Sequence, residues 1–121
     1  MNHEIRLKNL DYAYPDQSQP AIKNIDITIP KNKAVAFVGP SGVGKTTLVD
    51  VILGLLVPQR GSITVDGQNV FSNLDAWQRN IGYIPQFINL LDDSIRRNIC
   101  FGIPEDEVDE EMLQTAIEIA A

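Results

Sequence analysis

The stretch "FVGPSGVGKTTLVDVILGLL", from Phe37 to Leu56, decides how the rest of the chain is interpreted. Residues 34–38 are continuously apolar, which is typical of a strand covered on both faces. After the glycines, apolar residues recur at the spacing i, i+3, i+4 and i+7 of one helix face, namely Leu48, Val51, Ile52 and Leu55. The stretch therefore predicts a buried strand, a glycine loop and an amphipathic helix in direct succession.

The loop itself matches the phosphate-loop pattern G-x-x-x-x-G-K-[ST]. Glycines let the backbone curl so that successive N–H groups point at phosphate oxygens, and the following helix adds the positive end of its dipole. Lys45 supplies a charge for the β- and γ-phosphates, Thr46 is placed to bind Mg²⁺, and Thr47 is predicted to reach the α-phosphate. The alternative is a glycine-rich turn with a stray lysine, and the flanking strand and helix argue against it. We predict a nucleoside triphosphate site built from Gly39, Pro40, Ser41, Gly42, Val43, Gly44, Lys45, Thr46 and Thr47.

The segments around this loop predict further elements. Alternating apolar residues indicate strands at 5–10 and 25–29 that pair antiparallel, with a polar turn at 15–20 between them and an end at Pro30. Farther on, a short strand at 62–65 is followed by an Asp-Gly turn.

The second half of the chain is less periodic. Residues 73–80 predict one or two helical turns, and residues 81–84 predict a short strand. Helix signals dominate from residue 92, and the segment 104–121 predicts a helix whose acidic residues crowd its N-terminal end, where the helix dipole favours them.

Composition bounds the function. The 121 residues are 44% hydrophobic and 21% charged, which fits one small domain or part of a larger one. Ten Lys and Arg against sixteen Asp and Glu give a net charge of −6 without a basic patch, so we expect no nucleic-acid partner. One cysteine, Cys100, excludes an internal disulfide framework. The N-terminus is too polar for a secretory signal, and the most apolar run, 48–57, is too short to span a bilayer.

Five segments in a fixed order carry a family resemblance: "YP" at Tyr14, "GPSGVGKTTL" at 39–48, "PQRGSITVDG" at 58–67, "IGYIPQ" at 81–86 and "LLDDSIRRNICFG" at 90–102. This set resembles the first half of the nucleotide-binding domain of ATP-binding cassette (ABC) transporters, and the likeness covers nearly the whole chain. The last segment is most similar to export-type members. The resemblance implies an α/β fold: a partial phosphate-loop NTPase core of parallel strands with helices, an antiparallel β subdomain, and the start of a helical subdomain.

The resemblance also implies roles for single residues. Tyr14 falls where the family stacks an aromatic ring on adenine; Tyr12 is a rival for that role, and a core position is the alternative for Tyr14. Gln86 matches the family's glutamine loop, whose amide touches Mg²⁺ or the attacking water. Together with the phosphate loop, this implies that Lys45 and Gln86 are the catalytic residues and that Thr46 and Gln86 are the metal ligands. The alternative for Gln86 is an ordinary polar loop residue.

The implied partners are ATP, Mg²⁺, a membrane domain that is fused or separate, and a second nucleotide-binding domain, with the chain on the cytoplasmic side of the membrane. Residues 87–98 would lie near the face that meets the membrane domain; a solvated loop in which Ser94 or Asp93 caps a helix is compatible with that role.

Several parts of the family pattern are missing from these residues. The apolar run before Asp66 ends in Asp-Gly rather than Asp-Glu, so we interpret Asp66 as a turn residue. The signature beginning Leu-Ser-Gly-Gly does not occur, and the sole histidine, His3, is interpreted as a terminal residue rather than the switch. We expect residues 1–121 to be a partial domain that ends before the signature, the second metal-site motif (Walker B) and the switch histidine, and that binds ATP without hydrolysing it.

Other candidates receive plainer interpretations. Trp77 is expected to pack beside the hairpin, Cys100 lacks the histidine that a nucleophile needs, and the acidic run 105–111 is expected to be a solvated helix face. Two other functions stay open: a soluble phosphate-loop kinase or NTPase, for which no acceptor site or arginine-rich lid is visible, and a noncatalytic nucleotide-binding module.

Overall fold

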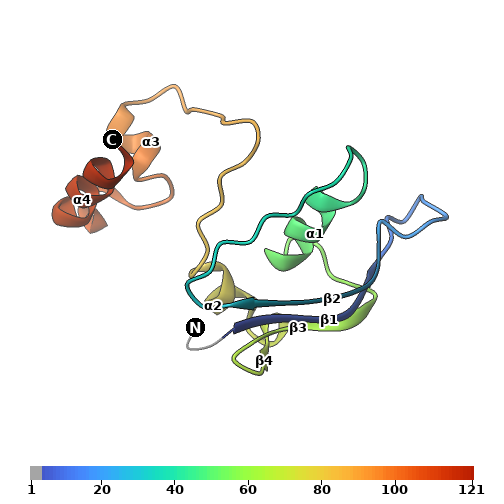
Figure 1. Cartoon of the computed structure of the whole chain (residues 1–121). Helices are drawn as coiled ribbons and strands as arrows, with labels where there is room; N and C mark the ends of the chain where they lie inside the picture. The colour runs from blue at the N-terminus through green and yellow to red at the C-terminus, as the bar shows by residue number, and fades with distance from the viewer. Residues whose placement is uncertain (1–3) are drawn as a thin grey trace. The chain divides into compact units, whose positions relative to one another are not determined.

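The computed structural model describes residues 4–121, so His3 lies outside the described residues. The chain divides into two compact units, the first ending at Gly82 and the second running from Tyr83 to Ala121 (Figure 1). The first unit contains the phosphate loop and an antiparallel sheet, and the second contains short helices.

A four-stranded sheet forms the base of the first unit. Its strands are β1 (Glu4–Tyr12), β2 (Ile22–Pro30), β3 (Arg60–Val65) and β4 (Gln68–Asn69). The order across the sheet is β2-β1-β3-β4, and every neighbouring pair is antiparallel. The antiparallel pairing of the first two predicted strands is therefore confirmed, as is the end of the second at Pro30.

A bulge in β1 sets which of its residues face the core. Leu7 and Leu10 are both fully buried although they are three positions apart, which strict alternation would not allow. The pairing with β2 shifts between these two residues, and Asn9 takes a left-handed φ of 48°. The Asn9 N–H donates to the Asp26 carboxylate over 3.1 Å, and its side-chain amide donates to Asn24 over 3.2 Å. The bulge therefore keeps the apolar face of β1 continuous.

Strand β3 approaches this bulge through a glycine. Gly61 has a φ of 84°, and a Cβ at this position would overlap the carbonyl oxygens of Lys8 and Asn9. Only glycine combines this backbone conformation with so close an approach between strands. Gly61 thus fixes how β3 passes the bulge.

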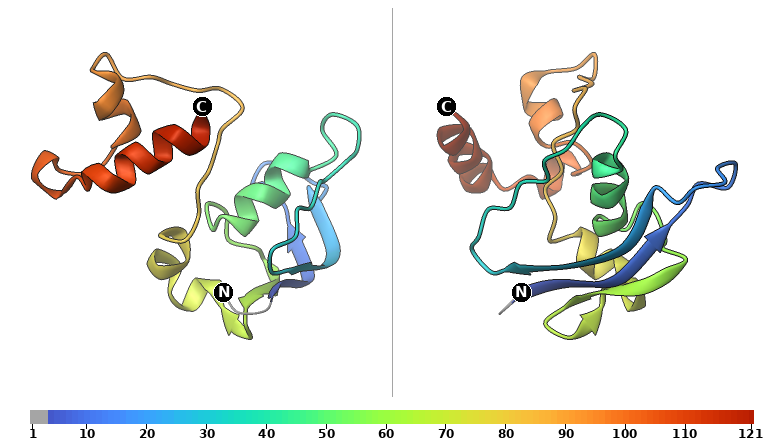
Figure 2. Two further views of the ribbon diagram at one scale, coloured as in Figure 1. Left: turned by 60° about the vertical axis from the view of Figure 1, so that its left-hand side comes forward. Right: turned by 45° about the vertical axis from the view of Figure 1, so that its right-hand side comes forward.

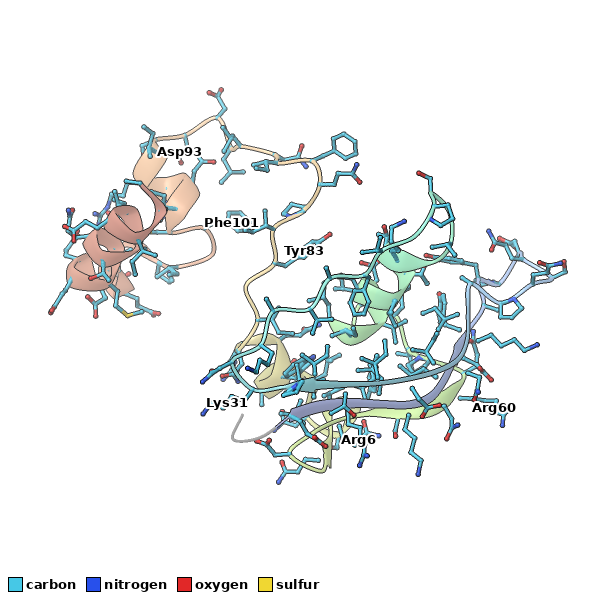
Figure 3. All side chains as sticks on the ribbon, in the orientation of Figure 1. Arg6, Lys31, Arg60, Tyr83, Asp93 and Phe101 are labelled. Carbon is cyan, nitrogen blue, oxygen red and sulfur yellow. The ribbon has the colours of Figure 1, made fainter. Side chains whose placement is uncertain are left out.

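Helix α1 (Lys45–Ile52) covers one face of the sheet, as Figures 1 and 2 show. Figure 3 shows Arg6 of β1 projecting from the opposite face, which agrees with its exposed position in the alternation. The shared core consists of Leu7, Leu10, Tyr12, Ile22, Leu48, Val51, Ile63 and Val70.

The predicted helix stripe is confirmed except at its last member. Leu48 and Val51 are buried, but Leu55 is 60% exposed. The helix ends at Ile52 because Gly54 adopts a φ of 75°, and the Leu55 N–H then donates to the Asp50 carbonyl over 2.9 Å. This reversal points the chain away from the face of α1 that meets the sheet.

The hairpin after β3 and the short helices that follow agree with the sequence. Asp66 and Gly67 form the turn between β3 and β4, with φ angles of 50° and 83°. A 3-10 turn, η1 (Val70–Ser72), leads into α2 (Leu74–Gln78). Trp77 packs against the core and its indole N–H donates to the Ile52 carbonyl over 2.8 Å. The predictions for Asp66 and Trp77 are confirmed.

Two of the predicted strands, at 34–38 and 81–84, are not formed in the described structure. Residues 34–38 and 81–84 are extended but form no strand, and Val38 and Ile84 are 93% and 85% exposed. A strand needs a neighbour to accept its N–H groups, and the described part of the chain offers none to either segment. The parallel strands of the predicted core are accordingly not present among the described residues.

The second unit consists of helices α3 (Ile95–Ile99) and α4 (Glu110–Ala120) and the 3-10 turn η2 (Glu105–Glu107). The Ser94 hydroxyl caps α3 by accepting from the Arg97 N–H over 3.2 Å, as the sequence allowed. The predicted helix from 104 onward is interrupted, because the Asp109 side chain accepts from the Met112 N–H over 3.0 Å and so starts α4 anew. Within residues 4–121, no helix has both the length and the apolar content to cross a bilayer.

An ion-pair cluster joins the two helices of this unit. The Arg96 guanidinium contacts the Glu105 carboxylate at 2.8 Å and also donates to the carboxylate of Glu110. Arg97 contacts Glu105 at 3.3 Å. The acidic run is therefore not only a solvated face, since two of its members hold arginines. The hydrogen bonds from Arg96 lower the pKa of Glu110 below its ordinary value.

Replacing Gly61 with alanine should destabilise the first unit by about 1–3 kcal/mol, because a left-handed non-glycine residue would also collide with two carbonyl groups. Gly67→Ala is the matched control, since Gly67 has a φ of 83° but open space around it. Urea unfolding followed by Trp77 fluorescence measures both. If both variants lost the same free energy of unfolding, the close approach at Gly61 would make no separate contribution to stability.

Acid should loosen the second unit through Glu110. Because the folded-state pKa of Glu110 is lowered, its contribution to stability is complete above the ordinary glutamate pKa of about 4.3 and is lost as the pH falls through the lower folded value. Circular dichroism at 222 nm should show an acid transition that is smaller in Glu110→Gln. Glu118→Gln, which removes a carboxylate with no arginine partner among the described residues, should leave the transition unchanged.

Candidate nucleotide-binding site

The glycine loop lies between the extended segment 33–38 and α1, and two of its glycines have left-handed backbones. Gly42 has a φ of 81° and Gly44 a φ of 98°. A Cβ on Gly44 would overlap the carbonyl oxygen of Ala21, the residue just before β2. The loop is therefore held against the start of β2 by a contact that only glycine permits.

Helix α1 starts without a cap of its own. Gly44 is its N-cap, no side chain accepts from the first turn, and no acidic residue lies there. The first N–H groups of a helix have no acceptor within the helix, and they carry the positive end of its dipole. This end of α1 is thus available to an anion.

The Lys45 side chain folds back and hydrogen-bonds to the backbone of its own loop. Its ammonium group donates to the carbonyl oxygens of Gly39 and Pro40 at 2.8 and 2.7 Å. These bonds place a positive charge at the mouth of the loop. An incoming polyphosphate would replace them with stronger bonds, since hydrogen bonds between two charged groups exceed those to a neutral carbonyl.

A cavity of about 410 Å³ opens between this loop and the turn after β1. Among the described residues that line it none is acidic, although the sequence contains sixteen Asp and Glu, and Lys45 is the only charged one. The lining residues are Tyr14, Gln17, Gln19, Pro20, Ala21, Gly42, Val43, Gly44, Lys45, Thr46 and Thr47. This electrostatic character suits a polyanion and disfavours a cation.

The two candidate aromatic residues occupy different places. Tyr12 is buried in the core at 7% exposure, whereas Tyr14 is half-buried and lines the cavity. Their rings meet edge to face, with centroids 5.1 Å apart. The Tyr14 hydroxyl lies 3.1 Å from the Thr47 hydroxyl oxygen. Tyr14 is therefore the aromatic side chain that reaches the loop, and its role against adenine stays a prediction.

Gln59 fixes the backbone that carries Tyr14. Its side-chain amide accepts from the Ala13 N–H and donates to the Ala13 carbonyl, both over 2.8 Å, in the manner of a strand partner. Sequence reasoning missed this residue because nothing in the pattern around Pro58 marks it. It also missed Gln17 and Gln19, whose only signal is their place in the polar turn that follows Tyr14.

The structure brings together part of the predicted set. Tyr14 and residues 42–47 line one cavity, and the carbonyls of Gly39 and Pro40 hold Lys45. Ser41 is exposed at the tip of the loop and is not among the lining residues of the cavity. Gln86 lies exposed in the extended start of the second unit, so its role in metal binding and catalysis stays a prediction.

Metal binding at this site would depend on few protein groups. No group of three or more His, Cys, Asp or Glu suited to a metal occurs within residues 4–121. Thr46 is exposed and lines the cavity, so its hydroxyl is available as one oxygen ligand. Mg²⁺ commonly takes its other ligands from phosphate oxygens and water, which fits a site that binds metal together with a nucleotide.

Comparison with known proteins identifies the family to which the chain is similar. Residues 22–120 match the family model described as ABC transporter. The chain is 40% identical over 100 residues to the mitochondrial iron-sulfur clusters transporter atm1 of Neurospora crassa, a match that covers 82% of this chain and 14% of the relative. It is 42% identical over 101 residues to the corresponding protein of Chaetomium globosum, covering 82% and 16%.

A bacterial relative extends the comparison. A multidrug resistance ABC transporter ATP-binding and permease protein of Lactococcus lactis is 33% identical over 108 residues, covering 88% of this chain and 18% of the relative. The chain thus spans less than a fifth of the length of these relatives. The family model covers most of the chain and includes the loop that holds Lys45, and the chain therefore belongs to the ABC transporter family.

Proposed function

We propose that this chain is the ATP-holding part of the nucleotide-binding domain of an export-type ABC transporter. The observation that carries the proposal is the cavity that joins Tyr14 to the glycine loop, with Lys45 as the one charged residue among the described residues that line it. The relatives named as transporters of iron-sulfur clusters and as multidrug transporters support the export type. In the longer protein, ATP binding would close two such domains and move a membrane domain.

Three residues of the cavity, together with Gln86, would have defined tasks in nucleotide binding. Lys45 would move from the Gly39 and Pro40 carbonyls to the β- and γ-phosphates, and the free N–H groups of α1 would hold the same oxygens. Thr46 would bind Mg²⁺, whose charge neutralises the phosphates when it is bound. Tyr14 would stack on the adenine ring, and Gln86 would complete the metal site and position the attacking water.

The exposed extended segments would acquire partners in the longer protein. Residues 34–38 are apolar and follow the pattern of a strand buried on both faces, so we infer that they join a parallel sheet of the phosphate-loop core. In the second unit, Phe87, Ile88 and Leu90 are 78%, 70% and 77% exposed. We infer that this stretch meets the membrane domain on the cytoplasmic side, that a second nucleotide-binding domain completes the site, and that nucleic acid is not a partner.

Hydrolysis requires groups that these 121 residues do not contain. The glutamate of the second metal-site motif, the signature and the switch histidine are all missing from these 121 residues. Because phosphoryl transfer depends on positioning several charged groups around the γ-phosphate, one lysine and one glutamine are insufficient. We infer that residues 1–121 form a partial domain that binds Mg-ATP and leaves it intact.

Lys45→Ala should weaken Mg-ATP binding by at least about tenfold, because hydrogen bonds to charged groups contribute about 1.5–3 kcal/mol. Lys33→Ala is the control, since Lys33 is exposed and is not among the lining residues of the cavity. Isothermal titration calorimetry with and without Mg²⁺ measures the affinity. Equal affinity in both variants would exclude the glycine loop as the phosphate site.

The 121-residue chain should release no more phosphate from ATP than buffer does. Phosphate release is followed by a coupled colorimetric assay at saturating Mg-ATP, with Lys45→Ala as the background. A turnover that is well above background and vanishes in Lys45→Ala would show that the residues present suffice for hydrolysis.

A further inference from the structure

We propose that the Tyr14 hydroxyl is a positioning group for the phosphates, acting through Thr47, in addition to any stacking by its ring. This inference rests on the proposed nucleotide site and specifies how the Tyr14 side of the cavity is connected to the phosphate loop. The observation is the 3.1 Å contact between the Tyr14 and Thr47 hydroxyl oxygens, made by residues 33 positions apart in the sequence.

Thr47 is well placed to pass a hydrogen bond on. It lies in the first turn of α1, where backbone N–H groups have no helical acceptor, and it is 7% exposed while still lining the cavity. Threonine is branched at Cβ, so its side chain is restricted to few rotamers and its hydroxyl oxygen occupies a defined position, while the hydroxyl proton can turn toward either partner. A small movement of its partner would therefore change where its proton points.

The direction of this hydrogen bond matters for anion binding. A hydroxyl has one proton and two acceptor lone pairs. If Tyr14 donates to Thr47, the Thr47 proton remains free to be donated to a phosphate oxygen. If Thr47 donates instead, it presents only lone pairs to the anion, which repel it. A bound phosphate therefore selects the order Tyr14 to Thr47 to phosphate, and the two hydrogen bonds strengthen each other.

Tyr14 can supply this bond because contacts with Tyr12 and Gln59 fix the position of its ring and backbone. Its edge-to-face partner, Tyr12, is buried in the core, and Gln59 clamps the backbone of Ala13 through two hydrogen bonds of 2.8 Å. A tyrosine side chain has only two rotatable angles before its rigid ring. The face that would stack on a base and the hydroxyl that contacts Thr47 thus move as one body.

The test is a double-mutant cycle on ligand affinity with Tyr14→Phe, Thr47→Val and the double variant. Both single changes remove a hydroxyl and keep the size of the side chain. The ligands are Mg-ATP and inorganic tripolyphosphate, which has phosphate oxygens but no base. Tyr12→Phe is the matched control for Tyr14→Phe, because it removes a hydroxyl from a neighbouring core ring that is not among the lining residues of the cavity and leaves the ring that packs against Tyr14 in place. Thr47→Ser keeps the hydroxyl and should restore most of the affinity.

Tyr14→Phe should lower the affinity for both ligands by a similar factor of about 2–10, the range of one neutral hydrogen bond. In the Thr47→Val background, Tyr14→Phe should lower the affinity no further. If Tyr14 acted only by stacking, Tyr14→Phe would leave the affinity for both ligands unchanged, because the variant keeps the ring and tripolyphosphate has no base to stack on it. If Tyr14→Phe weakens binding equally with and without the Thr47 hydroxyl, or not at all, the relay is wrong while the nucleotide site stands. If the unaltered chain binds neither ligand, both the relay and the proposed site are wrong.

Discussion

The packing of α1 on the antiparallel sheet is the interaction on which the site depends. Val51 is fully buried and Leu48 nearly so, in one cluster with Leu7, Leu10 and Ile63 of the sheet. Burying side chains of this size contributes about 1.5–3 kcal/mol each, so this layer accounts for much of the stability available to a small unit. Because the glycine loop is the N-terminal continuation of α1 and Tyr14 follows β1, the same contact fixes the distance between them.

Two backbone features keep this layer in register. The bulge at Asn9 turns Leu10 back to the core face, and Gly61 lets β3 pass the bulged strand closely. Gly44 plays a similar part just before the edge strand β2, where it lies against the Ala21 carbonyl. Backbone positions that only glycine or asparagine adopt readily thus determine where the apolar faces meet.

The elements that depend on local signals could be predicted from the sequence, and those that depend on distant partners could not. Alternation gave β1 and β2, the Asp-Gly pair gave the hairpin at Asp66, and the glycine-lysine pattern located the loop. Residues 34–38 have the composition of a buried strand, yet a strand exists only beside another, and the described chain supplies no neighbour.

The same distinction applies to the site. The pattern pointed to Lys45 and its neighbours, and the resemblance pointed to Tyr14, but neither could show that they line one cavity whose described lining includes no carboxylate. The clamp of Gln59 on Ala13 joins residues 46 positions apart, which no local pattern encodes. Likewise, the pairing of Glu105 and Glu110 with Arg96 was missed because a run of acidic residues is usually solvated.

The two carbonyl groups that hold Lys45 have a consequence for selectivity among anions. A ligand gains from the lysine only what exceeds the bonds that the ammonium already makes to Gly39 and Pro40. To bind a single chloride ion, the ammonium group would give up two well-aligned carbonyl oxygens for one diffuse charge. A di- or triphosphate tail instead presents several oxygens and a larger charge at once. The two bonds that Lys45 already makes to carbonyl oxygens therefore favour a polyphosphate tail over a monovalent anion as the ligand that replaces them.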